Sequence, residues 1–542
     1  MYQALLTNRY LTTRVIPLIA VAAVALCVAL VIIVVSVMTG FLNMVKSSGR
    51  VLMGDVVIQY PVQGIPHFEL VIEELERLPE VAAATPVVDS WGLLKMPYPE
   101  GPNKDTRYVQ IWGIEPESFA RVTGYADTLY WRPLKENQRA SEHDLRRLMT
   151  DQLVEDAMSL RDHRTGRPAI VMGMHVSEGN QRQRDGSYHP LGDGYWWMPQ
   201  YEVTLTTLPV DTGGDLGLQP ESFIFPIVNE FVSGVFVIDN TRVMIPFNVA
   251  QRMFHLDEAE RVDEQLNPVG VFPGRATIIL VRAADGVTPD RLRDMVATAY
   301  NDLVVRSRSG DPAFHVPLQR EGFGLSIRTW EQQQAQFIGP VEKERELMRV
   351  LFSIIYLVCA GLVLTIFWAI VHEKTRDIGI LRSVGASRFG IAAIFLRYGA
   401  VIGAIGAVFG LGLAWLVVNN INAIHDAVGE DAPRWTWIAA FILAGGALMM
   451  AVFEMMRDRM LRLVLWALGT IVLALLGIGL YFHRGTLLWD PSVYYFSKIP
   501  NVIDFNTAIT TMIGAVIFSV IGAFVPAAKA ADTDPVNALR YE

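Results

Sequence analysis

The stretch His372–Ile391, HEKTRDIGILRSVGASRFGI, decides the architecture of this 542-residue chain. One uncharged run ends just before it, at Val371, and another begins after it, at Tyr398. The loop's basic residues Lys374, Arg376, Arg382 and Arg388 outnumber its acids, Glu373 and Asp377. An excess of Lys and Arg in a short loop between membrane spans marks the cytoplasmic side. The stretch therefore predicts a cytoplasmic loop between two spans.

The spacing inside this loop predicts a short amphipathic helix. Thr375 is a candidate N-cap, with Asp377 in the first turn. Ile378, Leu381 and Val384 recur at helical spacing and predict one apolar stripe. Such a helix across the mouth of two spans would receive force from a soluble partner. The alternative is a basic loop that rests on anionic lipid.

The ends of this helix also carry signals. Gly385 is expected to end it, and Ser387 to cap the helix that leads into the membrane.

Six uncharged runs have lengths near or above the roughly 20 residues that span hydrocarbon. They are Val15–Met38, Val350–Val371, Tyr398–Ile424, Trp435–Phe453, Leu463–Phe482 and Phe505–Ala528. A charge at mid-span costs about 2.5–3.5 kcal/mol, so its absence over such lengths is informative. With 51% apolar residues, the chain predicts a helical membrane domain of six spans and a large additional domain.

The compartments follow from charge. Arg9 and Arg14 place the N-terminus inside, and the first apolar run is too long for a cleaved signal. The predicted spans are residues 15–40, 350–371, 398–424, 435–453, 463–482 and 505–528. The predicted cytoplasmic segments are the N-terminus at 1–14, the coupling loop at 372–397, the linker at 454–462 and the C-terminus at 529–542. The predicted exterior parts are the domain with its stalk at 41–349 and a loop at 483–504.

The exterior segment is acidic, with 31 basic and 43 acidic residues, so nucleic acid is not an expected partner. Both cysteines, Cys27 and Cys359, fall inside spans, which excludes disulfides and cysteine-type metal sites from the exterior. Strand–helix–strand patterns near both of its ends predict an α+β lobe built from both ends. Strands between them, including Phe231–Ile238, predict a second, more β-rich lobe.

Three further segments of the exterior domain carry expectations. Residues 142–160 read as one amphipathic helix. Tyr195, Trp196 and Trp197 are either a lipid or partner contact or a buried anchor for their loop, and the anchor is favoured. Arg328–Arg349 is expected to be a helical stalk continuous with the second span.

The quoted loop resembles the first cytoplasmic loop of the ABC-transporter permeases of the MacB, FtsX and LolC/LolE group. The last residues, DTDPVNALRYE, are similar to the C-terminus of that group, and Ser36–Phe41 matches the pattern that ends its first span. The resemblance implies a coupling helix that docks on a separate ATP-binding subunit. The implied coupling residues are Glu373, Thr375, Arg376, Ile378, Leu381, Arg382, Val384 and Gly385, and the C-terminal motif comprises Asp534, Pro535, Leu539 and Arg540.

No G-x-x-x-x-G-K-[ST], H-E-x-x-H or G-x-S-x-G sequence occurs, so neither ATP binding nor catalysis is expected in this chain. The resemblance implies ATP and Mg²⁺ on an ATPase dimer, a second permease copy or paralogue, and a lipoprotein or hydrophobic cargo at the inner membrane. The alternatives are a MacB-like exporter, an FtsX-like regulator of a cell-wall hydrolase and, more distantly, a membrane-bound enzyme.

An apolar surface suited to acyl chains is expected between the outer halves of the first two spans. It would consist of Val37, Met38, Phe41, Leu42, Phe352, Ile355 and Tyr356. The alternative is that these residues serve only helix packing.

An insertion departs from the family pattern of four spans. Residues 433–485 contain two of the uncharged runs, separated by a linker with Arg457, Arg459 and Arg462. The positive-inside rule places that linker in the cytoplasm, so the inserted pair enters and returns. The alternative is a re-entrant or interfacial hairpin.

Overall fold

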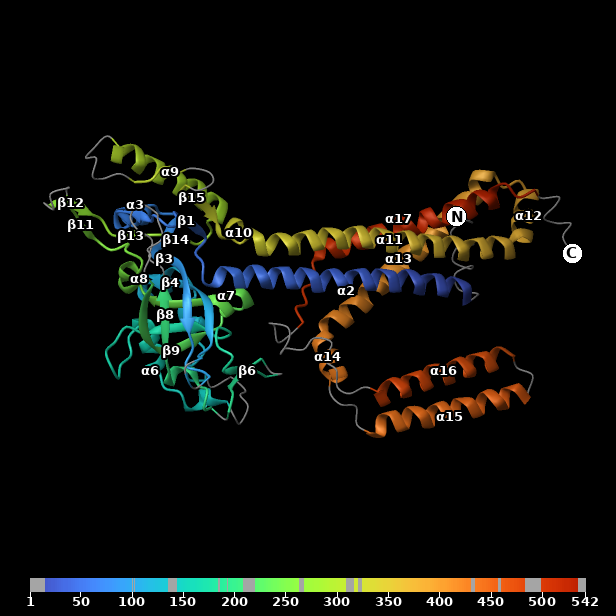
Figure 1. The fold of residues 1–542 in the computed structure, drawn as a ribbon. Helices are drawn as coiled ribbons and strands as arrows, with labels where there is room; N and C mark the ends of the chain where they lie inside the picture. Colours follow the sequence, from blue (N-terminus) through green and yellow to red (C-terminus); the bar gives the residue numbers. More distant parts are fainter. Residues whose placement is uncertain are drawn as a thin grey trace. The chain divides into compact units, whose positions relative to one another are not determined.

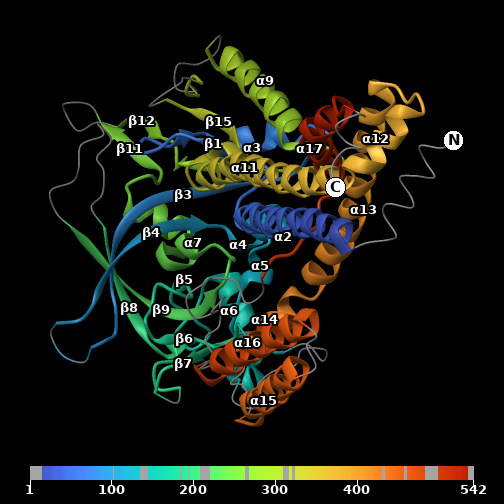
Figure 2. The ribbon, with the colours of Figure 1, turned by 90° about the vertical axis from the view of Figure 1, so that its right-hand side faces the viewer.

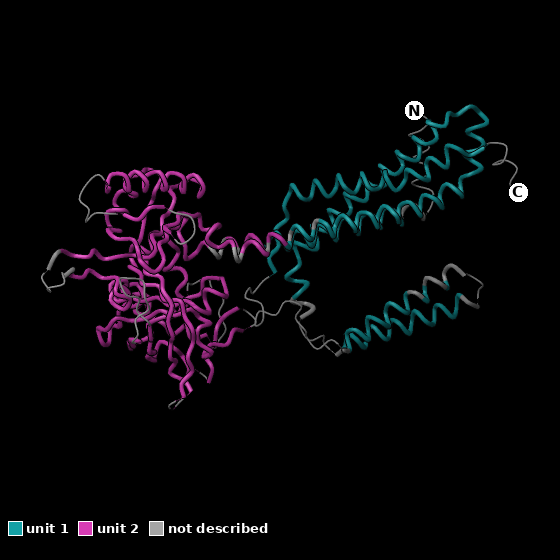
Figure 3. The backbone as a smooth tube through the Cα atoms, turned by 45° about the horizontal axis from the view of Figure 1, so that its top comes forward, with its two compact units in different colours: residues 1–41, 344–494, 498–542 teal, residues 42–343, 495–497 magenta. Residues whose placement is uncertain are grey.

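The computed structural model describes residues 15–99, 101, 103–134, 144–183, 186–192, 194–207, 220–262, 268–308, 316–319, 324–429, 434–456, 460–482 and 499–534. The chain divides into two units (Figure 3). Residues 1–41, 344–494 and 498–542 form the helical unit, and residues 42–343 with 495–497 form the sheet unit.

The sheet unit is built on nine strands (Figure 1). Their order is β15 (Ser326–Thr329), β1 (Val56–Gln59), β14 (Ile278–Ala283), β3 (Val81–Lys95), β4 (Thr106–Ile114), β10 (Arg242–Pro246), β5 (Ile170–Gly173), β9 (Glu221–Phe231) and β8 (Glu202–Thr207). β8 also pairs with the end of β3, where Leu93 faces Thr206. Six strands therefore close into a ring, and β15, β1 and β14 extend from it.

The predicted lobes are parts of this one sheet. The 15-residue strand β3 pairs with β14 along its first half and with β4 and β8 along its second (Figure 2). Helices α3 (Phe68–Glu76) and α9 (Pro289–Arg308) belong to the part built from both chain ends, as predicted. The β-rich part is not a separate lobe, because the two parts share β3.

Burial on both faces explains the apolar strands. In β1 the side chains of Val56 and Ile58 join one core cluster, whereas Val57 joins the cluster on the opposite face. In β14 Ile279 joins the first cluster and Leu280 the second. Continuous Val, Ile and Leu runs are the pattern of strands that are covered on both sides.

Two predicted elements of the sheet unit are wrong. The strand predicted over Phe231–Ile238 ends at Phe231, and α7 (Phe236–Thr241) follows. Gly234 adopts a φ of 90°, and the carboxylate of Asp239 accepts hydrogen bonds from the backbone N–H groups of Ser233 and Gly234, so the chain turns there.

The single helix predicted over 142–160 is divided. Its described part contains a 3₁₀ turn at Leu145–Leu148 and helix α6 (Gln152–Ser159). The Asp144 carboxylate accepts from the backbone of Arg146 and starts a separate turn, and this local bond competes with a continuous helix.

The helical unit contains α12 (Thr375–Ser383), α14 (Ile421–Gly429) and all or most of six long helices, of which α2 and α11 also include residues of the sheet unit. The six are α2 (Val15–Val51), α11 (Ala335–Glu373), α13 (Arg388–Asn419), α15 (Arg434–Met456), α16 (Met460–Phe482) and α17 (Phe505–Ala531). All except α16 contain a described stretch that is long and apolar enough to cross a membrane. The described apolar stretch of α16 covers only Gly469–Tyr481, so six spans are not confirmed.

Two helix ends differ from the predicted spans. The first span was bounded at residue 40, but α2 continues to Val51. The third was expected to reach Ile424, but α13 ends at Asn419 and α14 begins at Ile421. The stalk predicted over Arg328–Arg349 is helical only in part: Arg328 and Thr329 belong to β15, Trp330–Gln333 forms the short helix α10, and α11 runs as one helix from Ala335 to Glu373.

Small residues on α13 allow close helix packing. A Cβ atom on Gly403 would lie 2.9 Å from the Ser519 Cβ on α17, and one on Gly410 would lie 2.7 Å from the Ala25 carbonyl oxygen on α2. Small residues bring helices together where no hydrophobic effect drives their association. The first half of α13 therefore packs on α17 and the second half on α2.

Candidate functional site

Helix α12 lies in the loop that joins α11 to α13, and local hydrogen bonds end it at its C-terminus. Gly385 has a φ of 103° and its N–H donates to the Arg382 carbonyl, while the Ala386 N–H donates to the Leu381 carbonyl. These two bonds form a Schellman motif, so the predicted stop at Gly385 is confirmed. The Ser387 hydroxyl accepts from the Gly390 N–H at 3.0 Å and caps α13, also as predicted.

The predicted cap at the start of α12 is wrong. Lys374 occupies the N-cap position, and no side chain caps the helix there. The Thr375 hydroxyl instead donates to the carbonyls of Val371 and His372, which are the last turn of α11. A hydroxyl engaged in this way links α12 directly to the end of α11.

The predicted apolar stripe is split between two surfaces. Ile378 is only 3% exposed and belongs to the core of the helical unit, so its side chain offers no surface to a partner in this structure. Val384 is 84% exposed and Phe389 is 82% exposed, whereas Leu381 is half-buried. Ile378 anchors α12, whereas Val384 at its end and Phe389 at the start of α13 are exposed apolar side chains.

The loop and its neighbours also carry charged groups. Arg376 and Glu373 are exposed, and Arg382 is half-buried. Lys374 forms an ion pair with Asp377, with 3.0 Å between Nζ and Oδ2. The Arg388 guanidinium lies 3.7 Å from the Asp532 carboxylate, just after α17, which places the start of α13 beside the end of α17. Asp534 of the C-terminal motif is exposed, but Pro535, Leu539 and Arg540 lie outside the described residues.

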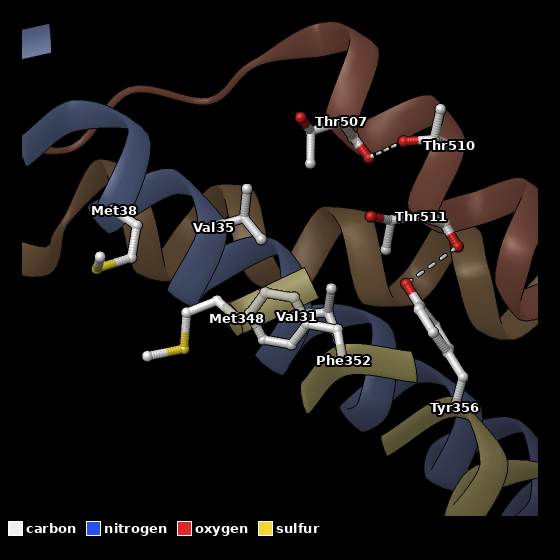
Figure 4. A pocket seen from close by; sticks show the side chains of 9 residues that line it. All are labelled: Val31, Val35, Met38, Met348, Phe352, Tyr356, Thr507, Thr510 and Thr511. Atoms are coloured by element: carbon white, nitrogen blue, oxygen red, sulfur yellow. Dashed lines mark hydrogen bonds between the residues drawn. The ribbon is translucent and has the colours of Figure 1, made fainter. Parts of the chain in front are cut away.

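A second candidate site is a cavity of about 370 Å³ between α2, α11 and α17 (Figure 4). The first two helices contribute apolar side chains and α17 contributes threonines. Its lining comprises Val31, Val35, Met38, Met348, Phe352, Tyr356, Thr507, Thr510 and Thr511. A flexible apolar lining with a few polar groups is typical of a pocket for a hydrophobic ligand.

The structure brings together three of the seven predicted acyl-chain contacts. Met38, Phe352 and Tyr356 line the cavity. Val37, Phe41 and Ile355 are half-buried and are not among its lining residues. Leu42 is buried in a core cluster of the sheet unit, so its prediction as a lipid contact is wrong for this structure.

Sequence reasoning missed the wall formed by α17. The Thr510 hydroxyl donates to the carbonyls of Asn506 and Thr507, and the Tyr356 hydroxyl donates to the Thr511 carbonyl at 3.5 Å. The Asp504 carboxylate caps the helix through the Thr507 N–H. Three threonines in the five residues 507–511, near the start of the last span, were the signal that could have revealed this wall.

The tandem aromatics are mainly an anchor, as favoured. Trp196 stacks on Tyr201 at 5.8 Å between ring centroids, and Trp197 meets Trp131 edge-on at 6.0 Å. Only Tyr195 is exposed.

One set of possible metal ligands occurs among the described residues, namely Asp156, Asp162 and His163, whose ligand atoms lie within 4.8 Å of one another. The Asp156 oxygens contact Gln152 and His163, and those of Asp162 accept from Arg164 and Thr165. These hydrogen bonds account for the cluster as a loop-stabilising feature.

The described residues on the two sides of the insertion in the sequence contact each other. The Asn422 side chain donates to the Ile499 carbonyl at 3.1 Å and accepts from its N–H at 2.8 Å. The Asn501 amide donates to the Val418 carbonyl at 2.8 Å. The chain therefore leaves α13 and enters α17 at neighbouring points. The helices α15 and α16, which lie between α13 and α17 in the sequence, pack against each other.

Two family models match the chain. Residues 18–213 match the MacB-like periplasmic core domain, and residues 349–457 match the FtsX-like permease C-terminal domain. The chain is 21% identical over 527 residues to the lipoprotein-releasing system transmembrane protein LolC of Neisseria meningitidis serogroup B, covering 97% of this chain and 94% of that protein.

Two further matches cover part of the chain. The LolC protein of Xylella fastidiosa is 24% identical over 262 residues, 48% of each chain. The crystal structure of the periplasmic region of MacB from Actinobacillus actinomycetemcomitans matches 54% of this chain and 97% of its own, at 11% identity and a TM-score of 0.26.

Proposed function

We propose that this chain, which belongs to the MacB/FtsX superfamily of permeases and is of the LolC type, is the membrane subunit of an ABC transporter that releases lipoproteins. It takes its cargo from the outer leaflet of the cytoplasmic membrane. A separate ATP-binding subunit, present as a dimer with its own Mg²⁺, hydrolyses ATP. A second permease copy or a paralogue completes the complex.

The observation that carries this proposal is the course of α11. This helix contributes Phe352 and Tyr356 to the cavity and ends at Glu373, beside α12. Seventeen residues of helix span about 25 Å, so one continuous helix links the cytoplasmic loop to the outer half of the membrane. Movement of α12 by a partner would therefore move one wall of the cavity.

We also propose roles for residues within the coupling loop. Ile378 fixes α12 to the helical unit, and the exposed Val384 and Phe389 contact the ATPase. Arg376 lies on the exposed part of the loop, where it would meet acidic groups at the rim of the partner's groove. Glu373, Thr375 and Gly385 set the position and length of the helix.

Copurification with the ATP-binding subunit tests the docking surface. A buried charge in a small interface removes most of its affinity, so Val384→Asp should lower ATPase recovery at least about tenfold. Val305→Asp is the matched control, because Val305 is a 69% exposed valine on α9 of the sheet unit. Equal recovery of ATPase with both variants would refute the assigned surface.

Photo-crosslinking tests the cargo site. A crosslinker at Phe352 should label lipoprotein, whereas one at Leu357, which is 65% exposed on the same helix, should label bulk lipid. Labelling of a peptide or small molecule in place of lipoprotein would favour a MacB-like exporter.

A further inference from the structure

The only two cysteines in the sequence, Cys27 and Cys359, meet inside the helical unit. Cys27 belongs to α2 and Cys359 to α11, and one thiol donates a hydrogen bond to the other. Cys359 is 6% exposed in the core of the helical unit, and the half-buried Cys27 packs against that core. The fold therefore brings together two thiols that lie far apart in the sequence.

The thiol pair lies next to the apolar cavity of the helical unit. Val31, about one helical turn after Cys27, and Tyr356, about one turn before Cys359, both line that cavity (Figure 4). The helices α2 and α11 thus form two of its walls and contact each other at the thiols. A covalent bond between the thiols would fix these two walls to each other.

The position of Cys359 along α11 determines what such a bond would do. Cys359 precedes Glu373, the last residue of α11, by 14 residues, which is about 21 Å along a helix. Along α11 the pair therefore lies between the coupling loop and the cavity residues Phe352 and Tyr356. A bond to α2 at this point would prevent α11 from moving against α2 when α12 moves.

Two thiols in contact can be oxidised by a peroxide in two steps. The sulfur of Cys27, the more exposed of the two, attacks one oxygen of hydrogen peroxide, the O–O bond breaks, and a sulfenic acid and water form. The sulfur of Cys359 then attacks the sulfenic sulfur, an S–S bond forms, and the hydroxyl leaves as water with the thiol proton. The two sulfurs lose two electrons in total, and the peroxide gains them. Hydrogen peroxide carries no charge, so it enters an apolar environment far more readily than an ion does.

We propose that Cys27 and Cys359 form a redox modification site, at which a peroxide produces a disulfide that locks α2 to α11 and stops the release of cargo. The reduced pair leaves the two helices free to move against each other. Reduction of the disulfide by a dithiol, through thiol–disulfide exchange, restores both thiols. The effect on release rests on the proposed function, whereas formation of the disulfide does not.

Peptide mass spectrometry tests the pairing in the full chain in nanodiscs, after treatment with hydrogen peroxide and alkylation of the remaining thiols. A disulfide between Cys27 and Cys359 should form in the unaltered chain. The matched control combines Leu357→Cys with Cys359→Ser, which keeps two cysteines but moves one to a position on α11 that is 65% exposed. This control should lose the disulfide, because its thiol lies on another side of the helix. Equal disulfide formation in both chains, or none in the unaltered chain, would overturn the proposal.

Lipoprotein release by the full complex in proteoliposomes tests the lock. Hydrogen peroxide should slow release by the unaltered complex severalfold, and dithiothreitol should restore it. Cys359→Ser should release lipoprotein at the same rate with and without peroxide. Unchanged release by the disulfide-linked complex would overturn the lock. A reduced complex that releases no lipoprotein would instead contradict the proposed function, while mass spectrometry of the chain would still decide the pairing.

Discussion

Glu230 of β9 carries a carboxyl group that is completely enclosed by the sheet unit. Its two oxygens accept hydrogen bonds from Trp131 Nε1 at 2.8 Å and from Asn180 Nδ2 at 2.7 Å. Loss of solvation outweighs these bonds and raises the pKa of Glu230 to about 8. Burial likewise raises the pKa of Asp239 to about 7. The folded chain therefore binds these protons more tightly than the unfolded chain does.

This difference predicts a pH dependence of stability. A raised pKa in the folded state stabilises the fold fully at pH values below the unfolded pKa, and the benefit is lost as the pH rises through the folded pKa. We expect the thermal midpoint of the chain, followed by tryptophan fluorescence, to fall by roughly 5 °C between pH 5 and pH 8. Glu230→Gln should flatten this slope, whereas Glu202→Gln, at an exposed carboxylate on β8, should leave it unchanged. An unchanged slope with Glu230→Gln would contradict the assignment.

At the residue scale, the coupling loop shows a limit of sequence reasoning. Ile378, Leu381 and Val384 form one stripe by spacing, yet their exposure ranges from 3% for Ile378 to 84% for Val384. Spacing identifies a shared face only if the whole face meets one neighbour. Here the bundle covers one end of the stripe and leaves the other end open.

At the scale of elements, α13 depends on glycines that face its neighbours. A Cβ atom on Gly410 would lie 2.7 Å from both the Ala25 carbonyl oxygen and the Val28 Cβ, while one on Gly412 would meet no atom within 4 Å. Overpacking typically costs about 1–3 kcal/mol. We therefore expect Gly410→Ala to lower the thermal midpoint of the chain in nanodiscs and Gly412→Ala to leave it unchanged.

The two variants differ only in the side of α13 that they enlarge. A similar midpoint for both would show that α2 can move away from α13 at little cost.

The cavity between α2, α11 and α17 gives a further element-scale prediction. Thr511 is 6% exposed and lines this cavity from α17. Thr511→Leu adds volume to one wall, whereas Thr511→Val keeps the volume and removes the hydroxyl. If acyl chains occupy the cavity, Thr511→Leu should reduce lipoprotein crosslinking from Phe352 severalfold, and Thr511→Val should retain it. Equal crosslinking with Leu and Val would place the acyl chains elsewhere.

For the whole molecule, the insertion must leave the coupling loop and the C-terminal motif on the same side of the membrane. The contacts of Asn422 with Ile499 and of Asn501 with Val418 keep the end of α13 beside the start of α17. An inserted pair that enters and returns leaves the coupling loop and the C-terminal motif on one side. We therefore expect a deletion of residues 430–498, closed by a short linker, to insert and to bind the ATPase as the full chain does.

Cysteine accessibility tests the path of the inserted pair. In a chain with Cys27 and Cys359 replaced, a cysteine at Met456 should react only with membrane-permeant thiol reagents, because the positive-inside rule predicts a cytoplasmic position for the basic linker. A cysteine at Val62 of the exterior domain, where the side chain is 55% exposed, should react with impermeant reagents as well. Reaction of position 456 with an impermeant reagent from outside would favour a re-entrant hairpin.

Composition and local spacing were enough to predict the apolar helices, the large additional domain, the helix that leads into the second span and the C-terminal end of the coupling helix. Each of these depends on local physics. The absence of charge over about 20 residues is sufficient to predict a span. The φ of Gly385 and the Ser387 hydroxyl act within one helical turn of their own positions. Such features do not depend on which other element is nearby.

Which side chains share a surface depended on contacts between elements that are distant in the sequence. The tertiary structure joined the expected lobes through β3, turned Val232–Phe236 out of the sheet and placed Thr507, Thr510 and Thr511 opposite Phe352. It also moved Leu42 from the predicted lipid surface into the core of the sheet unit. These outcomes depend on contacts between residues that are distant in sequence. The spacing of residues along a single element does not show which other elements that element will contact.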